Sequence, residues 1–213
     1  MAQRGVFITF EGTEGAGKTT HIQRLSKALS EDGYAVCVTR EPGGTPISEA
    51  IRKLVLDPTH RTMTPTTELL LYAAARAQHV SERIRTAMHA GEIVICSRFT
   101  DATVAYQGYG RGLNLEMLRL LNQIATDGLT PDLTLWLDIP VEIGLERVRQ
   151  SRLAMDRLEQ EHLEFHQRVR AGYGAIAEQE PHRVKRIDAT QPVERVYEQI
   201  WEAVWEKMTA LRR

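Results

Sequence analysis

The sequence has almost no excess charge and very little cysteine. Its 27 basic and 28 acidic residues give a formal net charge of −1, so no field of one sign would attract a polyanion. This balance argues against a protein that coats nucleic acid. The two cysteines, Cys37 and Cys96, both lie in apolar, strand-like runs. We interpret them as reduced core residues of a cytoplasmic protein and not as a disulfide framework.

Long apolar runs and metal-binding motifs are missing as well. No stretch approaches the ~20 apolar residues that span a bilayer, and the first residues lack a basic segment leading into a long apolar one. We therefore expect no membrane span, no membrane partner and no signal peptide. The seven histidines show no spacing typical of a zinc site. No repeat or linker divides the 213 residues, so we expect a single domain over residues 1–213.

Short apolar runs alternate with helical patterns along the chain. Strands are expected near 5–11, 34–39, 92–96, 132–139 and 183–188. Helices are expected near 18–32, 47–56, 65–90, 114–127, 141–150, 157–179 and 192–211. This alternation predicts an α/β fold of three layers, in which helices cover both faces of a parallel sheet. Ligands should bind at the carboxyl ends of the strands. The stretch after the third strand, 97–108, is interpreted as an exposed loop.

The segment FEGTEGAGKTT (10–20) contains the pattern G-x-x-x-x-G-K-T between an expected strand and an expected helix. The glycines let backbone N–H groups point at phosphate oxygens, and the helix dipole favours the anion. Lys18 would reach the β- and γ-phosphates, and the Thr19 hydroxyl would hold Mg²⁺. The pattern predicts a P-loop NTPase fold with an ATP site. Its predicted residues are Gly12, Thr13, Glu14, Gly15, Ala16, Gly17, Lys18, Thr19 and Thr20.

A second segment narrows the class of nucleotide-binding protein. RVRQSRLAMDR (147–157) carries four arginines in eleven residues between two helical patterns, which is typical of a short lid that closes over donor phosphates. A GTPase should show Asn-Lys-x-Asp after a late strand, and none is present. A motor or a helicase would be larger. A small kinase fits these observations best.

The chain as a whole resembles the bacterial thymidylate kinases. The matching segments are FEGTEGAGKTT, TREPGGTPISEAIRKLVL, LLLYAAARAQHV, SRFTDATVAYQGYGRG, TPDLTLWLDIPVEIGLERV and MDRLEQEHLEFHQRVRAGY. The resemblance implies the reaction ATP + dTMP → ADP + dTDP with Mg²⁺. It also implies a five-stranded parallel core, a flexible lid over about 147–157 and a homodimer.

The resemblance also implies roles on the acceptor side. Glu14 would bind the 3′-hydroxyl of the deoxyribose. Glu41 and Pro42 would shape the phosphate site. Arg52 would contact the dTMP phosphate, although it also fits an ordinary exposed helix arginine.

Base recognition is expected from two segments. Tyr72 and Arg76 are four residues apart, on one face of a helix, and could stack on a pyrimidine and donate to its O4 edge. The resemblance places Thr103 and Gln107 at the thymine edge. It also places Tyr106 against the 2′ carbon, although core packing is an alternative for this tyrosine.

For catalysis, the resemblance implies Lys18, Arg98 and Arg152 as the groups that neutralise the phosphates. Arg147 would stack on adenine, and Arg157 could also reach phosphate. The alternative for the basic stretch 147–157 is a solvated, charged helix end.

Ser97 departs from the family pattern, which normally has an aspartate before the arginine of this segment. Serine keeps an oxygen but loses the charge that would favour a metal ion. Thr19 would then hold Mg²⁺, with Ser97 or Asp101 taking part through water. Two alternatives follow: a nucleotide-binding regulatory protein with impaired turnover, or a kinase of another deoxynucleotide.

Overall fold

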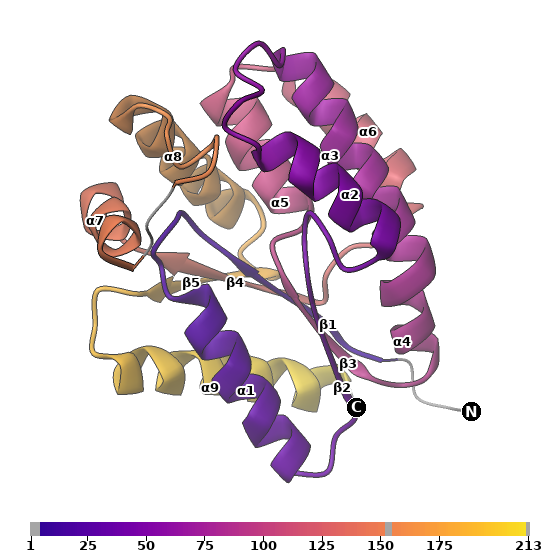
Figure 1. Cartoon of the computed structure of the whole chain (residues 1–213). Coiled ribbons are helices and arrows are strands. Elements are labelled where there is room, and N and C mark those ends of the chain that lie inside the picture. The colour runs from indigo at the N-terminus through magenta and orange to yellow at the C-terminus, as the bar shows by residue number, and fades with distance from the viewer. Residues whose placement is uncertain (1–4, 152–154, 212–213) are drawn as a thin grey trace.

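The computed structural model describes residues 5–151 and 155–211. A five-stranded parallel sheet runs through its centre in the order β2-β3-β1-β4-β5 (Figure 1). The strands are β1 (Phe7–Glu11), β2 (Val36–Arg40), β3 (Ile93–Ser97), β4 (Leu133–Asp138) and β5 (Val184–Asp188). The predicted α/β class and the parallel pairing are confirmed.

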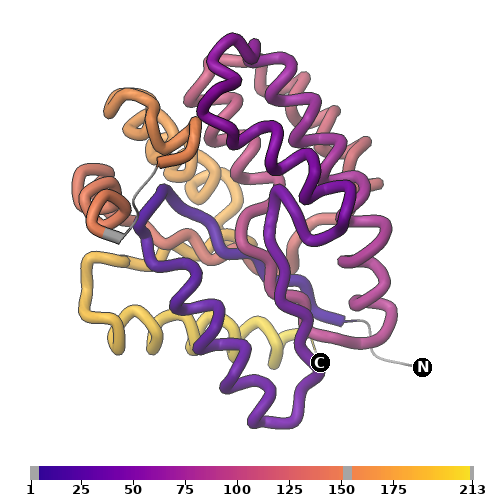
Figure 2. The backbone as a smooth tube through the Cα atoms, in the orientation of Figure 1, coloured from indigo at the N-terminus to yellow at the C-terminus, as the bar shows by residue number. Residues whose placement is uncertain are grey.

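Helices cover both faces of the sheet. They are α1 (Lys18–Glu31), α2 (Pro46–Leu56), α3 (Pro65–His79), the π-helical η1 (Val80–Ile84), α4 (Arg85–His89), α5 (Thr100–Thr103), the π-helical η2 (Val104–Gly110), α6 (Leu115–Thr126), α7 (Val141–Ser151), α8 (Leu163–Gln179) and α9 (Val193–Leu211). Figure 2 shows α1 and α9 side by side beneath the sheet, with the other large helices on the opposite side. No described helix is long and apolar enough to cross a membrane.

Alternation along the strands decides which side chains meet which layer. In β1, Ile8 and Phe10 pack in one cluster with residues of α1 and α9. Phe7 points the other way and packs with η1 and α4. At β1 both faces of the sheet are therefore buried, as a covered parallel sheet requires.

Two expectations need correction. The helix expected over 157–179 begins only at Leu163, after turns. The stretch 97–108 is not an exposed loop, because α5 and η2 follow β3 and bury Ala105, Tyr106 and Gln107. The ring of Tyr106 packs edge-on against Phe165 of α8, with centroids 6.1 Å apart. Burial against α8 thus turns a segment rich in glycine and polar residues into a helix.

Candidate active site

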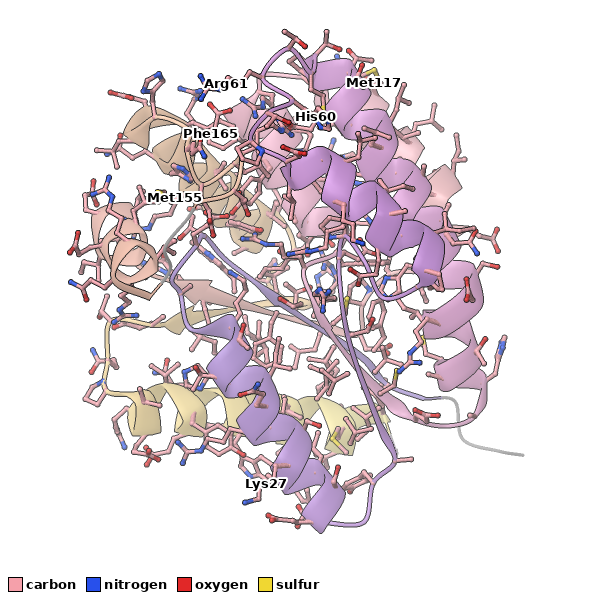
Figure 3. All side chains as sticks on the ribbon, viewed as in Figure 1. Lys27, His60, Arg61, Met117, Met155 and Phe165 are labelled. Carbon is pink, nitrogen blue, oxygen red and sulfur yellow. The ribbon has the colours of Figure 1, made fainter. Side chains whose placement is uncertain are left out.

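A cavity of about 440 Å³ opens at the carboxyl ends of the central strands. Of the predicted site residues that the structure describes, all line it except Gly12, Thr13, Asp101 and Arg157. We call the part formed by residues 15–20 and Arg147 the loop end. The part formed by Tyr72, Arg76, Thr103, Tyr106 and Gln107 is called the helix end. Figure 3 shows Lys27, near the C-terminal end of α1, on the opposite side of the molecule from Met155 and Phe165.

The phosphate-binding loop is shaped by glycine and by a distant helix. Gly17 has φ of 87° and is the N-cap of α1, a conformation that side chains rarely adopt. A Cβ on Gly15 would lie 2.1 Å from the carbonyl oxygen of Gly144 in α7, and a Cβ on Gly144 would lie 2.3 Å from the carbonyl oxygen of Glu14. Two glycines from distant segments therefore let the loop and α7 touch through their backbones.

Lys18 is folded back onto this loop. Its Nζ donates to the carbonyl oxygens of Gly12, at 2.9 Å, and Thr13, at 2.8 Å. Burial, together with the positive charge of Arg98, lowers the pKa of Lys18 to about 7. A polyphosphate would offer this ammonium group stronger acceptors than two carbonyls. Thr19 and Thr20 beside it are exposed.

Arg98 lies between the two ends of the cavity. Its φ of 70° places it in the left-handed region, a strain that functional sites often retain. Its guanidinium donates to the carbonyl of Gly12 at 3.0 Å, to the hydroxyl of Tyr173 at 3.2 Å and to Oε1 of Glu14 at 2.9 Å. It also lies over the ring of Tyr106, 4.7 Å from the centroid. One cation thus contacts both the phosphate-binding loop, at Gly12 and Glu14, and Tyr106 of the helix end.

Glu14 is held as a carboxylate. The hydroxyl of Tyr106 donates to its Oε1 at 2.6 Å, while Nδ1 of His166 lies 3.4 Å from its Oε2. Burial would raise the pKa of Glu14, but Arg98, His166 and Lys18 hold it well below its usual range. The hydroxyl of Tyr106 is therefore bonded to an acid, and its ring packs in the core. Core packing of Tyr106 is confirmed, whereas its contact with the 2′ carbon stays a prediction.

Arg76 at the helix end is 2% exposed. It donates from Nε to Glu41 at 2.7 Å, from Nη1 to Thr103 and Asn122, and from Nη2 to the carbonyl of Phe99. A guanidinium has five N–H groups, so within the described structure one on Nη2 is left for a ligand. The guanidinium of Arg76 is thus fixed by the described residues, and one of its N–H groups remains for a ligand.

The β2–α2 loop is fixed by similar contacts. Glu41 also contacts Nδ1 of His79 at 3.0 Å, and Arg52 donates to the carbonyl of Pro42 at 2.9 Å. Arg52 is half-buried and lines the cavity, so it is not an ordinary exposed helix arginine.

Glu11 is a candidate functional residue that the sequence analysis did not identify. It is fully buried at the end of β1. Its Oε1 accepts the backbone N–H of Phe99 at 2.6 Å, and its Oε2 accepts the hydroxyl of Tyr173 at 2.7 Å. Burial, with a smaller contribution from Asp101, raises its pKa to about 7. Its position directly before the phosphate-binding loop was the signal that could have found it.

The predicted metal ligands do not all lie at the cavity. Ser97 is half-buried at the end of β3 and lines the cavity with Thr19. Asp101 does not, because its carboxylate accepts two bonds from Arg183, at 2.8 and 3.0 Å. Asp101 also accepts from Thr134. The expectation that Asp101 serves a metal is therefore corrected: Asp101 neutralises a buried arginine.

The arginines of residues 147–157 do not all lie at the cavity. Arg147 lines the cavity and donates to the carbonyl of Gly15 at 3.3 Å. Arg149 is exposed and pairs loosely with Glu146. Arg157 does not face the phosphate site, because it donates to Glu68 at 2.5 Å and to the carbonyl of Val55 at 2.8 Å. Arg152, the predicted catalytic arginine of this segment, lies outside the described residues.

Known proteins are similar to this chain in sequence and in fold. The family model described as thymidylate kinase matches residues 10–200. The chain belongs to the thymidylate kinase family.

Curated relatives named thymidylate kinase share about half of the sequence. One from Synechococcus sp. (strain JA-3-3Ab) is 59% identical over 186 residues, which cover 86% of this chain and 87% of the relative. One from Thermomicrobium roseum is 53% identical over 207 residues, covering 97% and 98%. A crystal structure of thymidylate kinase from Ehrlichia chaffeensis has a TM-score of 0.77 and 33% identity, covering 95% of this chain and 99% of that one. The family does not favour the alternative of a regulatory binding protein.

Proposed function

We propose that residues 1–213 form one nucleoside monophosphate kinase domain that transfers the γ-phosphoryl group of ATP to dTMP, giving ADP and dTDP. The observation that carries the proposal is that one cavity has two unlike ends. A phosphate-binding loop lies at one end, and a tyrosine, an arginine and a glutamine lie at the other. Arg98 lies between them, where a phosphoryl group would pass.

The reaction requires positioning and charge neutralisation and no strong base, since the acceptor is already a phosphate oxygen. Backbone N–H groups of the loop and Lys18 would bind the donor phosphates. Arg98, oriented by Glu14 and Tyr173, would neutralise the phosphoryl group in transit. Arg52, Tyr106 and Glu14 line the cavity. Arg52 would bind the acceptor phosphate, and Tyr106 and Glu14 would contact the sugar. Arg152 stays a prediction.

The donor set fits a magnesium ion that is held mainly by the nucleotide. Mg²⁺ usually keeps several waters and takes one or two protein oxygens together with substrate phosphates. The hydroxyls of Thr19 and Ser97 would supply those oxygens. No group of three or more His, Cys, Asp or Glu residues within the described structure could hold a metal alone. When bound, the ion neutralises and orients the donor phosphates.

The assay measures ADP release with ATP and Mg²⁺ in the presence of dTMP, dUMP, UMP, dCMP or thymidine. We expect the highest kcat/KM with dTMP. Turnover that is greatest with another acceptor would reassign the substrate, and ATP and dTMP binding without turnover would favour the regulatory alternative. No release with dTMP at stoichiometric enzyme contradicts the proposal.

We also propose a homodimer formed through the outer faces of α3 and α6, which lie side by side (Figure 1). Four large apolar side chains are exposed there: Leu70 (53%), Met117 (43%), Leu120 (60%) and Ile124 (68%). Figure 3 shows Met117 at the outer side of the helices. Exposed apolar groups gathered on neighbouring helices favour association.

Light scattering after gel filtration tests the dimer. Ile124→Glu should give monomers, whereas Val193→Glu, at another exposed apolar position, on α9, should not. A monomeric wild-type protein contradicts the homodimer. A cytoplasmic location is proposed as well, supported by Cys37 and Cys96, which are both buried and unpaired.

A further inference from the structure

The carboxylate of Glu68, on α3, lies behind Gln107 and is 1% exposed. Nε2 of Gln107 donates to its Oε1 at 2.9 Å. Arg111 donates to both oxygens, at 3.3 Å to Oε1 and 3.1 Å to Oε2, and Arg157 donates to Oε2 at 2.5 Å. Oε2 thus receives two guanidinium groups, while the main partner of Oε1 is the amide.

This contact fixes which way the Gln107 amide faces. Burial would raise the pKa of Glu68, but the hydrogen bonds from Arg111 and Gln107 hold it below its ordinary value. The carboxylate is therefore ionised and can only accept. The nitrogen of the amide has to face Glu68, which leaves the oxygen for a ligand. Gln107 lines the cavity, and no described residue donates to that oxygen.

We propose that Glu68 is a positioning residue that makes the cavity select a pyrimidine carrying N–H at N3. The inference rests on the proposed function, since it takes the base to lie at the helix end. Thymine carries a hydrogen on N3 and an acceptor at O4, whereas cytosine has an acceptor at N3 and an amino donor at C4. The Gln107 oxygen and the remaining N–H of Arg76 complement thymine at both atoms. With cytosine, the acceptor N3 would face the acceptor oxygen of Gln107, and the amino donor at C4 would face the N–H donor of Arg76.

Glu68→Gln should reverse the amide. Two guanidinium groups keep the new side-chain oxygen at the Oε2 position, so the new NH₂ takes the Oε1 position. It can then donate only to the oxygen of Gln107, whose amide turns and presents its nitrogen to the ligand. The cavity keeps its shape and loses its acceptor. A purely structural role for Glu68 would not change which base is preferred.

The experiment measures kcat/KM for dTMP and dCMP on the same preparation of each variant. Because the two values share one protein sample, any loss of folded protein cancels in their ratio. We expect the ratio of dTMP to dCMP to fall about tenfold or more in Glu68→Gln, the usual consequence of leaving a buried polar group opposite the wrong partner. The matched control is Glu82→Gln. Its carboxylate accepts from Gln78 at 2.7 Å in an exposed pair of the same chemistry, and its ratio should not change.

The swap Glu68→Gln with Gln107→Glu sharpens the test. The new amide at position 68 would donate to one oxygen of the new carboxylate at position 107. The other oxygen of that carboxylate would face the ligand as an acceptor, and the total charge of the cluster is unchanged. The swap should restore the preference for dTMP. If Glu68→Gln does not fold, the swap carries the test alone.

The outcomes separate this inference from the proposed function. Equal losses with both substrates in Glu68→Gln, or a folded swap variant without preference for dTMP, would overturn the role of Glu68. A wild-type enzyme that does not prefer dTMP would instead overturn the proposed substrate.

Discussion

At the helix end of the cavity the polar side chains already hold one another, whereas at the loop end Thr19, Thr20 and Arg147 are exposed. Arg76 satisfies four acceptors inside the protein, and Glu68 receives three side chains. At the loop end, Arg147 is exposed and makes one contact of 3.3 Å to the loop. A preformed network costs little to order on binding and therefore gives specificity. The loop end is left for the nucleotide to organise.

Arg98 contacts both the phosphate-binding loop and Tyr106 of the helix end, so its removal should have the largest effect on activity. We expect Arg98→Ala to lower kcat about 10³-fold, the lower limit for an arginine that neutralises a transferred phosphoryl group. Steady-state ADP release with dTMP measures this. Arg195→Ala, on the exposed side of α9, is the matched control. A fall of less than about tenfold would place Arg98 outside the chemistry.

Arg76→Met tests whether the helix end is preformed. The change leaves the buried carboxylate of Glu41 without its arginine, which should cost about 3–5 kcal/mol of unfolding free energy. The KM for dTMP should rise about tenfold or more, because a hydrogen bond from a charged group is lost. The KM for ATP should stay the same.

Urea denaturation and separate titrations of each substrate measure these effects. Arg83→Met, on an exposed position of η1, serves as the control. Equal increases in both KM values would show that the two ends are not independent.

Ser97→Asp tests the loop end. A carboxylate at the end of β3 adds a charged oxygen to the cavity that Thr19 also lines, so the Mg²⁺ concentration for half-maximal rate should fall roughly threefold to tenfold. Ser97→Ala separates charge from the loss of the hydroxyl and should not lower that concentration. An unchanged Mg²⁺ titration in Ser97→Asp would mean that the missing acid has no effect on the metal.

The smallest expected effect is the uptake of protons by Lys18 when ATP binds. Its pKa of about 7 leaves it mostly neutral at pH 8. ATP phosphates favour the charged form and raise this pKa, so binding at pH 8 should take up protons, at most about one per site, and much less at pH 6. Calorimetry in two buffers of different ionisation enthalpy measures the number. Lys18→Met should abolish the difference between the buffers, and proton release on binding would contradict the assignment.

The loop end could be predicted from the sequence more completely than the helix end. Residues 12–20 are contiguous, and the shape of a phosphate-binding loop follows from its glycines and the helix after it. The helix end depends on contacts with Glu68, Asn122 and Tyr173, which come from three helices far apart in the sequence.

Local patterns also misjudged two charged residues. Asp101 was expected at the metal and Arg157 near phosphate, but Arg183 and Glu68 neutralise them in the interior. Asp101 and Arg183 are 82 positions apart in the sequence, and Glu68 and Arg157 are 89 positions apart. Such pairings depend on tertiary contacts, so no spacing in the sequence reveals them. The helical form of 100–110 was missed for the same reason, because the packing of α8 decides it.

The close approach of Gly15 and Gly144 has a consequence for how the protein is made. The carbonyl oxygen of Gly144 lies only 2.1 Å from where a Cβ on Gly15 would be, so α7 packs directly on a loop translated about 130 residues earlier. A nascent chain that ends before α7 has the complete loop sequence but lacks the backbone that supports it. Nucleotide binding should therefore begin late in synthesis, after both halves of the sheet have emerged and paired.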